Sequence, residues 1–177
     1  MEQKKILGEE RRELLLQLLK DNGAPITGSE LAARTNVSRQ VIVGDITLLK
    51  AKGEPIIATS QGYMYLKQAS LSATVERTIA CNHSPEKAEE ELTILVDYGV
   101  TVKNVTIEHP VYGDLTASIM VSNRKEVKQF MNKVKSTNAA FLSELTEGIH
   151  LHTISASTEK IINEAADALR NAGILIE

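Results

Sequence analysis

The chain has 177 residues, 42% hydrophobic and 24% charged, which is typical of a soluble globular protein with one ordinary domain or two small ones. No apolar run approaches the roughly 20 residues that a membrane helix needs, and no signal peptide is recognisable, so we expect a cytoplasmic protein without membrane contacts. A single cysteine, Cys81, excludes an internal disulfide and a multi-cysteine zinc site, so any metal site would use histidines and carboxylates.

The formal net charge of −3 hides an asymmetry along the chain. Residues 1–67 contain 10 Lys and Arg against 8 Asp and Glu, a net charge of +2, whereas residues 68–177 contain 10 against 15, a net charge of −5. All four histidines lie in the acidic part. The aromatic content of 3%, without tryptophan, argues against a stacking surface for single-stranded nucleic acid, but duplex DNA stays possible.

Three helices followed by a hairpin are predicted for residues 1–67. Leucines at helical spacing predict the first helix. A capping box predicts the start of a short second helix: the Thr27 hydroxyl accepts from the Glu30 amide, and the Glu30 side chain reaches back to Thr27. Ser38 caps the third helix, and two β-prone arms around a turn follow it. This order predicts a winged helix-turn-helix DNA-binding domain.

The rest of the chain, residues 68–177, predicts the order β-α-β-β-α-β-α-β, with a split βαβ arrangement. This order favours an antiparallel sheet with helices on one face. We therefore expect the α+β class, with the winged helix-turn-helix followed by a ferredoxin-like α/β sandwich, a layout found in many small-ligand regulatory domains. The predicted strands are 74–81, 102–108, 115–121, 149–156 and 174–176, and the predicted helices are 84–98, 123–135 and 157–171.

Polar residues at the start of the third helix are the candidates for DNA contact, because the first turn of a recognition helix enters the major groove. They are Ser38, Arg39 and Gln40, and Val43 is the next residue on that face. Arg39 could bond to guanine or grip a phosphate, and Gln40 suits adenine. The sequence leaves these roles open.

Gly44 is unusual, because an interior glycine costs a helix about 1 kcal/mol relative to alanine. Either the helix backbone lies close to DNA at Gly44, or Gly44 relieves crowding against the second helix. A helix-turn-helix also occurs as a protein–protein module. Because residues 1–67 carry only +2, DNA binding would require a homodimer, which we expect to form mainly through residues 68–177.

The run from Thr27 to Ile46 resembles the helix-turn-helix type of the biotin-repressor and deoxyribonucleoside-repressor groups. The second half of the chain is similar to the domain named for three histidines. Together the two halves resemble the niacin-responsive transcriptional repressors. One departure is Gly44, where related helix-turn-helix proteins often carry a basic residue. The resemblance implies a repressor rather than an enzyme, with nicotinate as co-repressor and genes of NAD biosynthesis or niacin salvage and transport as targets.

Two histidines, His150 and His152, are separated by one residue on a predicted strand, which sends both to the same face. His83 precedes a predicted helix, and Glu91 lies about two turns into it. The resemblance implies that His83, Glu91, His150 and His152 bind a metal, and such ligands suit divalent zinc, nickel, iron or manganese. Glu91 also belongs to a run of glutamates, and such a run is usually a solvated helix face.

His109 precedes a proline in a predicted turn and has three possible roles: metal ligand, effector contact or hydrogen-bonded turn histidine. We prefer the last two, because a carboxylate effector needs a hydrogen-bonding partner near the metal. Tyr112, in the same turn, could stack on a pyridine ring.

The sequence thus favours a metal-containing repressor that binds operator DNA in response to nicotinate. A metal-dependent hydrolase is the first alternative, although acid–base partners beyond Glu108 and Asp114 are not evident and no nucleophile motif is present. A purely metal-sensing regulator is the second, and it differs only in whether the metal is the signal or a fixed cofactor.

Overall fold

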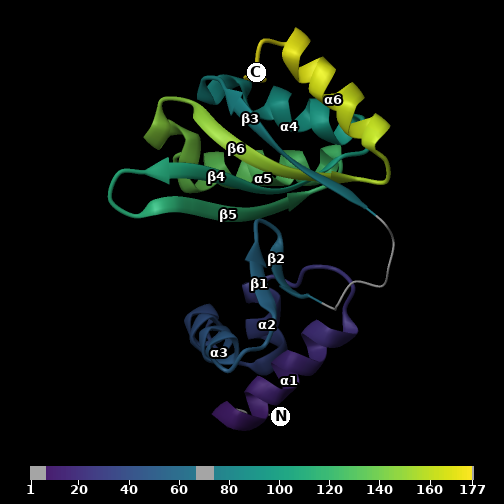
Figure 1. Ribbon diagram of the computed structural model, residues 1–177. Helices are drawn as coiled ribbons and strands as arrows, with labels where there is room; N and C mark the ends of the chain where they lie inside the picture. The colour runs from purple at the N-terminus through teal and green to yellow at the C-terminus, as the bar shows by residue number, and fades with distance from the viewer. Residues whose placement is uncertain (1–6, 67–73, 177) are drawn as a thin grey trace. The chain divides into compact units, whose positions relative to one another are not determined.

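Figure 1 shows a computed structural model of the chain, which describes residues 7–66 and 74–176. The chain divides into two compact units, residues 1–71 and 72–177. The boundary predicted between residues 67 and 68 lies outside the described residues. None of the described helices is long and apolar enough to cross a membrane.

The first unit contains the three predicted helices and the hairpin, which confirms the helix-turn-helix. The two strands pair antiparallel over four residue pairs. Leucines and isoleucines from the helices and from β1 form the core of this unit. The elements are α1 (Gly8–Asp21), α2 (Gly28–Thr35), α3 (Arg39–Ala51), β1 (Ile56–Thr59) and β2 (Gly62–Tyr65).

The predicted caps begin both helices of the motif. The Thr27 hydroxyl accepts from the Glu30 amide at 3.1 Å, and the Ser38 hydroxyl accepts from the Val41 amide at 3.4 Å. The reciprocal half of the predicted capping box is wrong, because the Glu30 carboxylate accepts from the Arg34 guanidinium, one turn along α2. Side chains four residues apart on a helix are neighbours. Glu30 therefore pairs with Arg34, and its carboxylate does not reach back to Thr27.

A buried ion pair joins α1 to the middle of α3. Asp45 is 3% exposed and accepts from Arg11 Nε at 2.6 Å, with Arg12 Nη1 at 3.3 Å. A carboxylate removed from water needs such partners, since an isolated buried charge is strongly unfavourable. The pair therefore sets the position of α3 against α1.

The second unit is a four-stranded antiparallel sheet in the order β3-β6-β4-β5, and Figure 1 shows its helices on one face. Strands β3 and β4, joined through α4, flank β6, which confirms the split βαβ arrangement and the α+β class. The predicted ferredoxin-like layout is wrong in strand order, because the central strands here are the second and fourth of the unit, β4 and β6, whereas the ferredoxin-like sheet has its first and third strands at the centre. The elements are β3 (Val75–Asn82), η1 (Pro85–Lys87), α4 (Ala88–Asp97), β4 (Thr101–His109), β5 (Gly113–Val121), α5 (Arg124–Thr137), η2 (Leu142–Thr146), β6 (Ile149–Ala156) and α6 (Glu159–Asn171).

Two segments differ from the sequence-based prediction. The strand expected at 174–176 is reduced to an isolated bridge between Leu175 and Cys81, because only this short end of the chain reaches the edge strand β3. The 3-10 helix η2 was not predicted, and it follows a left-handed residue, Asn138, that ends α5. This segment leads the chain from α5 back to β6.

Replacing Asp45 with alanine should destabilise the first unit by about 3 kcal/mol, because the substitution removes the buried carboxylate to which Arg11 and Arg12 donate. Urea unfolding of the full chain followed by circular dichroism measures this loss. The matched control is Asp97→Ala, which breaks an exposed pair with Arg124 and should change stability little. Equal effects of the two substitutions would contradict a structural role for the Asp45 pair.

Candidate metal centre and nucleic-acid interface

The four residues predicted as metal ligands lie together inside the second unit. His150 and His152 point to the helix-covered face of the sheet from β6, His83 follows β3, and Glu91 comes from the first turn of α4. Each is at most 8% exposed. Glu91 is thus not part of a solvated helix face, although its neighbours Glu89 and Glu90 are exposed.

The three imidazoles converge on one carboxylate oxygen. Glu91 Oε2 lies 2.8 Å from His83 Nε2, 3.2 Å from His152 Nε2 and 3.3 Å from His150 Nε2. The His150 ring packs edge-on against both other rings, with centroid separations of 4.9 and 4.8 Å. The arrangement leaves little freedom for any of the three side chains.

The second nitrogen of each ring contacts a backbone carbonyl. Nδ1 of His83, His150 and His152 lies 2.7 to 2.8 Å from the carbonyl oxygens of Ser84, Gly148 and Asn104. A carbonyl only accepts, so each Nδ1 carries a hydrogen, and a neutral ring then presents the lone pair of Nε2 to Glu91. Three lone pairs and a carboxylate oxygen cannot face one another without positive charge between them, either protons or a metal ion.

The surroundings of Glu91 favour its ionised form. Burial alone would raise the pKa of Glu91, but the adjacent histidines hold this pKa well below its ordinary value. Burial lowers the pKa of His83, and its hydrogen bonds with Glu91 and Ser84 raise it by more. The other oxygen, Glu91 Oε1, is the one fully enclosed side-chain oxygen or nitrogen without a hydrogen-bond partner among the described residues. The carboxylate therefore has unused ligand capacity, and imidazole nitrogens with a carboxylate fit a divalent transition metal.

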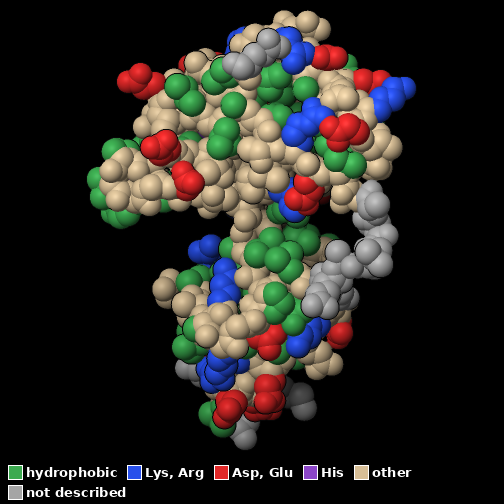
Figure 2. Space-filling view, viewed as in Figure 1, with side chains coloured by type: hydrophobic (Ala, Val, Ile, Leu, Met, Phe, Trp, Pro, Cys, Tyr) green, Lys and Arg blue, Asp and Glu red, His purple; other side chains and the backbone are tan. Residues whose placement is uncertain are grey.

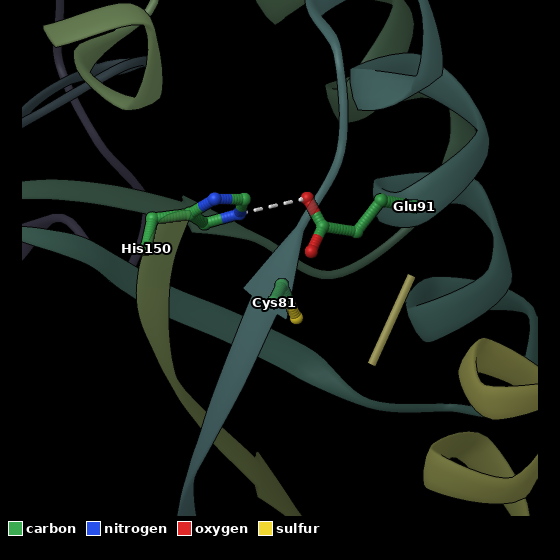
Figure 3. A group of neighbouring side chains, drawn as sticks. All are labelled: Cys81, Glu91 and His150. Carbon is green, nitrogen blue, oxygen red and sulfur yellow. Dashed lines mark hydrogen bonds and ion pairs between the residues drawn. The ribbon is translucent and has the colours of Figure 1, made fainter. Parts of the chain in front are cut away.

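A fifth side chain, Cys81, lies beside this group. It is opposite His150 in the ladder between β3 and β6, and Figure 3 shows it with His150 and Glu91. Its Sγ, a carboxylate oxygen of Glu91 and a ring nitrogen of His150 all lie within 4.8 Å of one another. Burial raises the pKa of the Cys81 thiol, and the charge of Glu91 raises it further. From the sequence we considered Cys81 only for disulfides and multi-cysteine sites. The pairing register of β3 and β6, which places Cys81 opposite His150, would have identified it as a neighbour of the histidines.

A cavity of about 240 Å³ opens onto the histidine cluster. The three histidines and Glu91 form part of its wall, and apolar residues from α4, α5, β4 and β5 form most of the remainder. Phe130 and Phe141 lie on this wall with ring centroids 6.4 Å apart. The cavity can therefore take a small molecule with a flat apolar body and one polar group.

The structure does not bring His109 and Tyr112 to this cavity. His109 is the last residue of β4, and Tyr112 lies in the turn that follows and is 75% exposed. His109 Nδ1 accepts from the amides of Val111 and Tyr112, so His109 is a hydrogen-bonded turn histidine, one of the two roles we preferred. An effector contact at these two residues stays a prediction.

The candidate DNA-contacting residues lie at the start of α3. Ser38, Arg39, Gln40 and Gly44 are exposed, and Val43 is half-buried. On the side seen in Figure 2, basic and acidic side chains are interspersed over the first unit, as its small net charge leads us to expect. The four exposed candidates at the start of α3 are therefore accessible to a partner.

Gly44 has open space around it. A Cβ at this position would meet nothing within 4 Å, so the interpretation that Gly44 relieves crowding against the second helix is wrong. The other interpretation, that the helix backbone lies close to DNA at Gly44, stays a prediction.

Comparison with known proteins places both units in known families. The family model of the 3H domain matches residues 76–177, and that of a helix-turn-helix (HTH) domain matches residues 11–64. The chain is 59% identical to the transcription repressor NadR of Bacillus subtilis (strain 168) over an alignment of 177 positions that covers 99% of this chain and 98% of that protein. It is 38% identical to the probable transcription repressor NiaR of Thermotoga maritima over 173 residues, 98% and 97% of the two chains.

Gly148 is predicted to be essential for the histidine cluster, because it has φ +99° and a Cβ there would lie 2.4 Å from the His83 carbonyl oxygen. Gly148→Ala should displace His83 and His150 and abolish metal binding, measured by elemental analysis of the reconstituted protein. Gly99→Ala is the matched control, since Gly99 has φ +79° but open space around it, so only backbone strain of about 1 kcal/mol is expected. Full metal content in Gly148→Ala would contradict this role.

Proposed function

Because this chain belongs to the NiaR-type family of transcription repressors, with an N-terminal helix-turn-helix and a C-terminal 3H domain, we propose that it represses transcription in response to nicotinate and uses a bound divalent metal ion to do so. The observation that supports this proposal best is the apolar cavity that opens onto three histidines and a buried glutamate. Genes of NAD biosynthesis or niacin salvage and transport are the proposed targets.

The helix-turn-helix is the DNA-binding part of the chain. We propose that Ser38, Arg39 and Gln40 contact the operator in the major groove, with Val43 and Gly44 next to the DNA. Their exposure on the first two turns of α3 supports this assignment. A homodimer would double the phosphate contacts of a unit that carries little net charge. Exposed Ile149 and Leu151, on the central strand β6 of the second unit, support pairing through residues 68–177.

The proposed metal ligands are His83, Glu91, His150 and His152, and the proposed metal is zinc, nickel, iron or manganese. A divalent ion bound here would supply positive charge that neutralises Glu91 and attracts an anionic or nitrogen ligand. The protein's own part is to hold the ligands in place: the backbone carbonyls of Ser84, Asn104 and Gly148 fix the orientation of the three rings.

The cavity beside this cluster is the proposed effector site. Nicotinate is a flat ring with one carboxylate, and the cavity joins apolar walls with two phenylalanines to a cluster of polar groups. Its volume of about 240 Å³ accommodates a ligand of this size. We therefore place the effector at the cavity rather than at the exposed turn of His109 and Tyr112.

An effector at this site can change operator binding only if it binds the DNA-competent state of the protein more tightly than the other state. The coupling is reciprocal, so operator DNA must raise the affinity for nicotinate by the same factor. The hydrolase alternative is not retained, since the relatives are transcription repressors. The metal-sensing alternative differs in a measurable way: metal alone would then switch operator binding.

The proposed function predicts that nicotinate tightens operator binding by about tenfold or more when the full chain is loaded with metal. The measurement is a titration of an operator fragment selected by the metal-loaded protein, with and without nicotinate, and sedimentation of the complex should give an even number of chains per operator. His152→Ala should lose both metal and response, whereas His109→Ala should keep the metal. An unchanged nicotinate response in His109→Ala would favour the cavity as the effector site, and an impaired response would favour the predicted effector contact at His109.

Two results would contradict the proposal. Operator binding that does not respond to nicotinate in the metal-loaded protein would remove nicotinate as effector. Operator binding switched by metal alone would indicate the metal-sensing regulator instead.

Gly44→Ala should have opposite effects on stability and DNA binding. It should stabilise the first unit by about 1 kcal/mol, because alanine favours the helix and its methyl group has open space. The same methyl group should weaken operator binding if the DNA backbone approaches α3 here. Thermal unfolding and the operator titration measure the two effects, and unchanged operator affinity in the stabilised variant would show that DNA does not approach Gly44.

A further inference from the structure

Ser143, in η2, is a buried polar residue on the wall of the cavity and is only 7% exposed. Its backbone holds the segment in place: the Ser143 carbonyl accepts from the Gly148 amide at 2.8 Å and from the Thr146 hydroxyl at 3.2 Å. Both bonds are made by the backbone carbonyl of Ser143 and do not involve its side chain.

The Ser143 hydroxyl makes no hydrogen bond to any of the described residues. A hydroxyl that has no partner in the protein can form its hydrogen bond with a ligand or with water. Because Glu91 Oε1 is the one fully enclosed unpartnered atom among the residues in 7–66 and 74–176, the Ser143 hydroxyl reaches open space. Ser143 lines the cavity and also a neighbouring pocket beside His83 and Gly148, so its hydroxyl can serve a molecule held next to the histidine cluster.

Ser143 also lies near the histidine end of the cavity. The Gly148 amide donates to Ser143, and the Gly148 carbonyl accepts from His150 Nδ1 at 2.8 Å, so a single residue connects Ser143 to the cluster. Apart from Ser143, the three histidines and Glu91, the eleven lining residues are all apolar. The polar groups are therefore gathered toward one end, and the other walls suit an apolar body.

We infer that Ser143 is a ligand-binding residue that donates its hydroxyl hydrogen bond to the carboxylate of a small aromatic acid in the cavity. This inference rests on the proposed function, because it gives the proposed effector site a second polar contact beside the metal ligands. A carboxylate has two oxygens, so one can face the histidine cluster while the other accepts from Ser143. A hydrogen bond to a charged group contributes more to affinity than a neutral one.

The test compares nicotinate binding to the full, metal-loaded chain and to its Ser143→Ala variant by isothermal titration calorimetry. Ser143→Ala should bind nicotinate about tenfold or more weakly, with unchanged metal content and unchanged thermal unfolding. Ser136→Ala is the matched control: Ser136 is exposed on α5, its hydroxyl donates to the Lys133 carbonyl, and its removal should leave nicotinate affinity unchanged.

The outcomes separate this inference from the proposed function. Equal nicotinate affinity of wild type and Ser143→Ala would overturn the role of Ser143 and leave the proposed function standing. A wild-type protein that binds no nicotinate would overturn both. A weaker Ser143→Ala that has also lost metal would show that Ser143 supports the metal ligands and would overturn a direct contact with the effector.

Discussion

One buried carboxylate surrounded by three imidazoles constrains the whole C-terminal unit. Glu91 lies within 3.3 Å of three ring nitrogens, and its other oxygen has no hydrogen-bond partner among the described residues. Removing such a charge from water is unfavourable unless positive charge compensates it. His83 and Glu91 come from the neighbouring segments after β3 and at the start of α4, whereas His150, 59 residues after Glu91, comes from β6. The split βαβ order makes this possible, because it places β6 directly beside β3.

The same constraint explains why the cavity lies where it does. The segment from α5 to β6 passes through η2 and turns at Gly148, whose missing side chain lets the chain approach the His83 carbonyl. This path closes an apolar cavity on one side and leaves the histidine cluster on its wall. The proposed metal ligands and the proposed effector site thus share a boundary, so a ligand that enters the cavity meets the histidine cluster directly. In the first unit, the Asp45 pair plays a comparable part, since it fixes the helix that carries the proposed DNA contacts.

Local patterns in the sequence predicted most of this architecture. Two histidines one residue apart on a strand share a face, and the caps at Thr27 and Ser38 are set by residues three positions apart. Features that depend on distant contacts were not predictable in the same way. Cys81 and His150 are neighbours because of the strand register, which the sequence does not give. Ser143 is a candidate ligand contact only because it lines the cavity, which forms when distant segments pack together. The choice between two explanations of Gly44 needed the space around the helix.

We propose that a divalent metal ion compensates the charge of Glu91 among the three histidines. Metal analysis of the purified full chain after reconstitution, combined with X-ray absorption at the edge of the bound metal, tests this proposal. We expect about one metal ion per chain, with scattering from several imidazole rings and an oxygen ligand. Metal well below one ion per chain, or a bound metal without imidazole scattering, would contradict it.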